Sequence, residues 1–154
     1  MKADRVGMTV LALLFYMLCR AAVAFLPPED SVGPLRAWIE APTQVSPGDL
    51  PFQGAVCVRN ESNGTVSVSL TMAGTDGWSI APNGETVADV EAGKEARFAF
   101  SVSAPDEVFN AHYPVHAWIE CHRGNETMRL HPILVFETTR FPVRVSQRKT
   151  VSWK

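Results

Sequence analysis

The 154-residue sequence lacks an uninterrupted apolar run long enough to cross a bilayer as a helix. Its longest run, residues 8–19, has twelve residues, against the ~20 that a spanning helix needs. It follows Lys2 and Arg5 and precedes Ala22-Val23-Ala24, an order of positive, apolar and small residues that is typical of a secretory signal peptide. We therefore expect cleavage after Ala24, a secreted, periplasmic or cell-surface protein, and no stable membrane anchor after that cleavage.

The sequence also lacks a concentrated positive charge. Without the 24 signal residues, 130 residues remain, with 11 basic and 15 acidic side chains and a net charge of −4. Nucleic-acid binding requires a concentrated basic face, so we expect no nucleic-acid partner. The locally basic stretch at residues 139–154 is interpreted as a solvated tail or an extra strand.

Catalytic motifs are missing as well. The chain has no Gly-rich phosphate loop, no metalloprotease helix motif and no evident Ser-His-Asp, Cys-His or paired-carboxylate arrangement. A small sandwich also has little room for a closed, dry active site. We predict that the protein is not an enzyme and that it uses no cofactor.

What the sequence has is a series of short strand-like runs separated by turn residues. β-Branched and aromatic residues alternate with polar ones, and no convincing amphipathic helix interrupts them. The pattern predicts an all-β fold, an immunoglobulin-like antiparallel β-sandwich of seven to eight strands. The predicted strands are 35–40, 52–59, 66–72, 78–80, 86–90, 96–103, 113–121 and 127–137, with 141–145 as one more strand or a linker. The expected regions are a signal peptide at 1–24, a linker at 25–34, the sandwich at 35–138 and the extra strand or basic tail at 139–154.

Several segments resemble one family in their order along the chain. They are VCVRNES at 56–62, VEAGKEARF at 90–98, VSAP at 102–105 and AHYPV at 111–115. Together they resemble the CARDB-type and α-galactosidase-associated Ig-like accessory domains of bacteria, which are similar in shape to fibronectin type III domains. The resemblance covers residues 35–138 and implies a non-catalytic spacer, docking or adhesive module. Those modules usually occur within long chains, whereas the expected module here directly follows the expected signal peptide. We therefore expect either a one-domain protein or the amino-terminal piece of a longer one.

Two tryptophans occupy the same position in two copies of the tetrapeptide Ala-Trp-Ile-Glu. If Ile39 and Ile119 face the core, Trp38 and Trp118 point outward, because neighbouring strand residues face opposite sides. They would form a platform for sugar rings or a protein, or else cap the sandwich edges or pack beneath the C-terminal segment. The candidate contact residues for a protein or polysaccharide partner are Trp38, Trp118, His116 and His131.

The four histidines all fall between His112 and His131. His116 and His131 share the outward phase of neighbouring predicted strands and can meet across a ladder. Imidazole binds Zn and Cu, so the alternative function is a small periplasmic metal-binding protein. Its candidate ligands are His116, His131, Glu120 and His122. The chain has no close His-x-His or Cys-x-x-Cys pair, which favours solvated surface histidines instead.

Once the signal peptide is removed, Cys57 and Cys121 remain as a candidate disulfide at the inter-sheet position of Ig-like domains. The alternation argues against it, because Cys121 aligns with the core residues while Cys57 lies between inward-facing neighbours. Cysteines on opposite faces do not reach the ~5.5–6 Å Cα separation of a disulfide. A bulge in either strand would restore the phase.

Three asparagines begin Asn-x-Ser/Thr sequences in predicted turns: Asn60, Asn63 and Asn125. In a eukaryotic secretory pathway they would be glycan acceptors. In an exported bacterial protein they serve as turn-forming residues, which is what the family resemblance implies.

Overall fold

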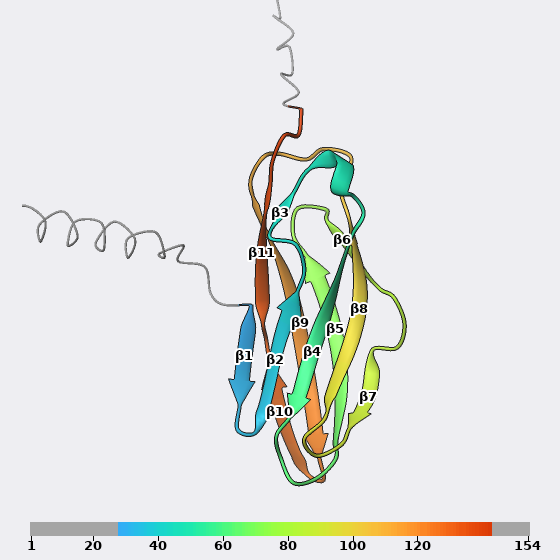
Figure 1. The fold of residues 1–154 in the computed structure, drawn as a ribbon, viewed down its shortest axis with the longest axis vertical. Helices are drawn as coiled ribbons and strands as arrows, with labels where there is room; N and C mark the ends of the chain where they lie inside the picture. The colour runs from blue at the N-terminus through green and yellow to red at the C-terminus, as the bar shows by residue number, and fades with distance from the viewer. Residues whose placement is uncertain (1–27, 143–154) are drawn as a thin grey trace, which may run out of the picture.

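A computed structural model describes residues 28–142, which form two β-sheets packed face to face (Figure 1). The predicted signal peptide lies outside this range. One sheet has the strand order β1-β2-β4-β8-β6; the other has the order β3-β11-β9-β5-β7, with β10 also paired to β9. The strands are β1 (Glu29–Val32), β2 (Leu35–Glu40), β3 (Gln44–Val45), β4 (Phe52–Asn60), β5 (Val66–Gly74), β6 (Ser79–Pro82), β7 (Val87–Val90), β8 (Glu95–Ser103), β9 (His112–Arg123), β10 (Glu126–Leu130) and β11 (Ile133–Thr138). The predicted Ig-like β-sandwich is thereby confirmed.

The core forms where the inward faces of the two sheets meet, as the alternation predicts. Along β8, for example, Phe98, Phe100 and Val102 are buried while the residues between them are not. An aromatic group fills one part of this core: the Phe136 ring lies edge-on to Phe52 and Trp78, at centroid distances of 5.2 and 4.9 Å. Interlocking rings of this size hold the two sheets together mainly through burial of apolar surface.

Gly54 in β4 is a glycine because Phe100 leaves no room for a side chain. A Cβ atom at this position would lie 2.3 Å from the Phe100 Cζ atom and 2.9 Å from the Ala41 Cβ atom. The missing side chain therefore lets the Phe100 ring pack directly on the β4 backbone.

The structure differs from the sequence-based strand assignment in three places. The segment predicted as a linker contains β1, which pairs antiparallel with β2. The short strand β3, which the sequence did not indicate, pairs parallel with β11, so the sheets are not purely antiparallel. The single strand predicted at 127–137 is divided into β10 and β11 at His131 and Pro132, because proline has no N–H for the ladder and the His131 N–H bonds Asp30 Oδ2 instead (2.8 Å).

The start of β9 carries a feature typical of Ig-like sandwiches. The Tyr113 hydroxyl donates to the Phe109 carbonyl oxygen (3.1 Å) and accepts from the Phe109 N–H (3.2 Å). A tyrosine near the start of a strand whose hydroxyl bonds the backbone a few residues upstream is the tyrosine corner of this fold class.

Among residues 28–142, no helix has the length and apolar character needed to cross a membrane.

The sequence predicted that Asn60 lies in a turn, but Asn60 is fully buried at the end of β4. Its Nδ2 donates to the carbonyl oxygens of Gly64 (2.8 Å) and Val90 (2.9 Å), and its Oδ1 accepts from the Ser62 N–H (2.9 Å). Because both amide hydrogens are used inside the protein, Asn60 is unsuited to carry a glycan. Asn63 and Asn125 are exposed, as expected.

Candidate functional site

Three aromatic rings gather on the outer face of the second sheet. His116 and Trp118 are two residues apart on β9 and therefore point to the same side. His131 joins them from the β10–β11 break, because the pairing of β10 and β11 with β9 places it beside Trp118. The three ring planes lie within 24° of one another, with centroids 4.9 to 5.3 Å apart. We call His116, Trp118 and His131 the ring cluster.

Hydrogen bonds hold the two histidines of the ring cluster in place. The His116 Nδ1 and His131 Nε2 atoms are 3.1 Å apart, so one nitrogen donates its proton to the other. The bond from the His131 N–H to Asp30 anchors the same segment to β1 of the opposite sheet. Trp118 nevertheless keeps 42% of its surface exposed. The cluster is thus an aromatic surface that faces solvent, and the outward orientation of its three residues is the one that the sequence predicted.

We expect the stability of the protein to fall as the pH drops through about 6.5. Burial, together with the neighbouring His131, lowers the pKa of His116 below its ordinary 6.5. The unfolded chain therefore binds this proton more readily than the folded one, so acid favours unfolding; above pH 6.5 the effect vanishes. Urea unfolding at pH 7.5 and 5.0 measures it. The His116→Gln variant should show a smaller difference between the two values, and an equal difference in the variant would contradict this origin.

The predicted metal-ligand set is corrected by the structure. Glu120 is engaged by Arg129 (Nε to Oε1, 2.8 Å), and His122 bonds Thr127 (Nδ1 to Oγ1, 3.0 Å). His116 and His131 are in hydrogen-bond contact, while His112 lies at the start of β9, opposite Glu137 in the register. Within residues 28–142, no three histidine, cysteine or acidic side chains are grouped so that they could hold a metal ion. The ligand set was inferred from the outward orientation of its residues. That orientation does not determine how far apart the residues lie along neighbouring strands.

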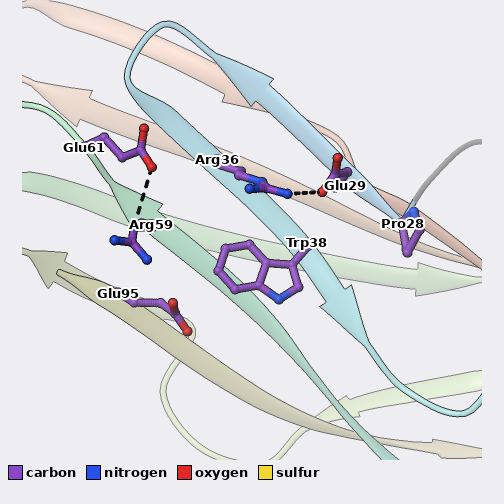
Figure 2. A pocket seen from close by; sticks show the side chains of 7 residues that line it. All are labelled: Pro28, Glu29, Arg36, Trp38, Arg59, Glu61 and Glu95. Carbon is purple, nitrogen blue, oxygen red and sulfur yellow. Dashed lines mark hydrogen bonds and ion pairs between the residues drawn. The ribbon is translucent and has the colours of Figure 1, made fainter. Parts of the chain in front are cut away.

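Trp38 does not join the ring cluster, contrary to the prediction of one shared contact face. It points outward from β2, on the opposite side of the sandwich. There it borders a shallow depression of about 400 Å³ on the outer face of the first sheet (Figure 2). The depression is lined by Pro28, Glu29, Arg36, Trp38, Arg59, Glu61 and Glu95. The two Ala-Trp-Ile-Glu segments therefore present separate surfaces.

The two described cysteines are not bonded to each other, which corrects the candidate disulfide. Cys57 lies opposite Trp38 in the strand register and accepts a hydrogen bond from Arg97 Nη1 (3.3 Å) on the outer face of the first sheet. Cys121 belongs to the core of the second sheet. The phase argument against the bond is therefore right. Burial raises the pKa of each thiol to about 11, so both are protonated and unreactive at neutral pH.

Sequence reasoning missed Asp30 and the charged residues around Trp38. Asp30 lies in a segment with weak strand propensity and acts on a residue 101 positions away. Glu29, Arg36, Arg59 and Glu95 occupy exposed positions on their strands, and this phase was a signal that they face away from the core. Their grouping around Trp38 depends on strand order, which the alternation does not contain.

Comparisons with known proteins bear on the fold. No family model and no curated protein matches the chain. Among solved structures, it is similar to part of native Escherichia coli alpha-2-macroglobulin (13% identity, TM-score 0.58), covering 70% of this chain and 7% of that one. It is also similar to the GAE domain of yeast GGA1 (9% identity, TM-score 0.54), covering 70% of this chain and 95% of that one. At these identities the similarities show the Ig-like sandwich fold alone.

Proposed function

We propose that the protein is an exported, non-catalytic Ig-like module that binds a protein partner through the ring cluster. The observation that carries the proposal is the ring cluster itself: three stacked rings, with the two histidines hydrogen-bonded to each other and Trp118 open to solvent. Large exposed aromatic side chains on a rigid support are the usual centre of a protein-binding surface, because they bury much apolar area at little cost in conformational entropy.

The chemistry of the described residues supports binding rather than catalysis. The two thiols are protonated at neutral pH, and the paired histidines face each other rather than a nucleophile. The carboxylate nearest along β9, Glu120, is held by Arg129. A spacer without a ligand would have no need of an exposed, hydrogen-bonded ring stack. The signal-peptide pattern and the resemblance to bacterial Ig-like accessory domains support an exported module of that type.

Site-specific photocrosslinking in the exporting cell tests the proposal. Thr71 is exposed and lies opposite Trp118 in the β5–β9 register, so a photoreactive residue there sits beside the ring cluster without disturbing it. We expect one protease-sensitive adduct, lost when Trp118→Ala is added. The same probe at Phe109, which is 67% exposed and outside the cluster, serves as control.

Three outcomes would contradict the proposal. One is the absence of any adduct at Thr71, and another is the same adduct at Thr71 and Phe109. The third is an adduct removed by glycosidases and not by proteases, which would assign the ring cluster to a polysaccharide instead. Trp118→Ala removes a side chain from the surface, so the fold should survive, and a thermal unfolding curve checks this.

A further inference from the structure

We infer that the depression beside Trp38 is a second binding site, and that its ligand is a neutral saccharide. The depression measures about 400 Å³, within the ~300–1,000 Å³ of small-ligand sites. Figure 2 shows the indole of Trp38 surrounded by charged side chains from β1, β2, β4 and β8. An aromatic surface bordered by hydrogen-bonding groups is the basic requirement for holding a sugar ring.

The indole is held in a fixed orientation before any ligand arrives. Its Nε1–H donates to Glu40 Oε1 (2.9 Å), and the second carboxylate oxygen of Glu40 is held by Arg97. In the strand register Trp38 lies opposite Cys57, whose side chain is buried although it points to this outer face. The indole therefore has support below it and polar anchors at its edge, so little conformational entropy is lost on binding.

The groups around the indole suit a pyranose ring. One face of such a ring presents C–H groups that can pack on the indole, while its hydroxyls project sideways as donors and acceptors. Around Trp38, carboxylates and guanidinium groups provide both kinds of partner. They belong to Glu29, Arg36, Arg59, Glu61 and Glu95. Hydrogen bonds to charged groups are stronger than those between neutral groups, which favours a ligand rich in hydroxyls.

Three carboxylates and two guanidinium groups line the depression, and both guanidinium groups are already paired, which disfavours an anionic ligand. Arg36 is paired with Glu29 (2.5 Å) and Arg59 with Glu61 (3.6 Å), so an anion would have to displace a carboxylate from its guanidinium. A cation would compete with Arg36, whose guanidinium carbon already lies 5.9 Å from the centre of the Trp38 ring. Glu95 forms no ion pair within the described part of the chain and is free to accept a hydroxyl.

This inference does not depend on the proposed function. Trp38 and the ring cluster point outward from different sheets, so loss of one surface leaves the other intact. A chain with both sites could hold a protein on one face and a glycan on the other.

Saturation-transfer difference NMR of the full chain with four neutral hexasaccharides tests the inference: cellohexaose, xylohexaose, mannohexaose and chitohexaose. We expect transfer to the ring C–H protons of at least one. Trp38→Ala should weaken that binding at least about tenfold, equivalent to 1.4 kcal/mol. Trp38→Phe, which keeps an aromatic surface, should retain part of it, and Trp118→Ala, the matched variant on the other face, should leave it unchanged.

Glu95→Gln keeps the test valid if Trp38→Ala fails to fold, because Glu95 is exposed and unpaired with any described cation. We expect this variant to weaken binding severalfold. No transfer to any of the four sugars would overturn the inference, as would binding that survives both Trp38→Ala and Glu95→Gln. Loss of sugar binding in Trp118→Ala alone would move the saccharide to the ring cluster and leave Trp38 without a ligand.

Discussion

Replacing Phe136 with alanine should lower the free energy of unfolding by about 3–5 kcal/mol, the range measured for large-to-small changes at fully buried aromatic positions. Phe136 in β11 is fully buried and contacts rings from three other places in the chain. Its centroid lies 4.9 Å from Trp78, 5.2 Å from Phe52 and 5.9 Å from Tyr113. Phe52 belongs to the first sheet and Tyr113 to the second, so the ring fills space between them. Alanine would leave a cavity that the neighbouring rings are too rigid to close.

Urea unfolding followed by tryptophan fluorescence measures the change, provided that the slope against urea is the same as for the unaltered protein. Phe109→Ala is the matched control, because it removes the same side chain from a position that is 67% exposed. It should alter stability by no more than about 0.5 kcal/mol. Equal losses at the two positions would mean that Phe136 is not the centre of the core.

The alternation of side chains along the strands was sufficient to predict the core. Val66, Val68 and Leu70 of β5 face inward as the sequence indicates, and so do Tyr113, Val115 and the other residues of that phase in β9. The reason is physical, because a strand buried on one face must place apolar residues at every second position. The same rule predicted that Trp38 and Trp118 point outward, and it argued against the candidate bond between Cys57 and Cys121, which are free in the structure.

The pairing of distant strands could not be predicted in the same way. β1 has the sequence EDSV and β3 has two residues, so neither carries an apolar pattern of its own. Each exists because a neighbouring strand offers free N–H and C=O groups. The ring cluster shows the same limit. Phase predicted that His116 and His131 face outward and can meet across a ladder, as they do. The stacking of both rings on Trp118 was not predicted, because it depends on the break at His131 and Pro132.

The sequence predicted one shared contact face for Trp38 and Trp118, and a related reason explains why the structure has two. The two Ala-Trp-Ile-Glu segments are identical in sequence and in phase, yet β2 and β9 belong to different sheets. Periodicity reports which face of its own sheet a residue occupies, and it contains no information on which sheet that is. The strand order is needed to separate the Trp38 depression from the ring cluster.

Replacing Asn60 with alanine should lower the free energy of unfolding by about 2–4 kcal/mol, the cost of leaving buried backbone groups without hydrogen-bond partners. The Asn60 side chain serves three of them: the carbonyl oxygens of Gly64 and Val90 and the N–H of Ser62. The Val90 bond lies in the buried interior and joins the end of β7 to the end of β4, where no solvent can replace the lost amide. Asn60→Asp should be at least as harmful at neutral pH, since a carboxylate would face two carbonyl oxygens and donate to neither.

Asn63→Ala is the control that separates this effect from the loss of any asparagine in the same loop. Asn63 is exposed, and its side chain makes no hydrogen bond within residues 28–142, so its replacement should change stability by no more than about 0.5 kcal/mol. The Asn60→Asp variant tests the role of the buried amide in a second way, through the pH dependence of its stability. A carboxyl facing two carbonyl oxygens has its pKa raised in the folded state, so the variant should regain stability as the pH falls and that group becomes protonated. If Asn60→Ala matched Asn63→Ala in urea, and Asn60→Asp showed no recovery in acid, the buried amide would not be the link between β4 and β7 that the geometry indicates.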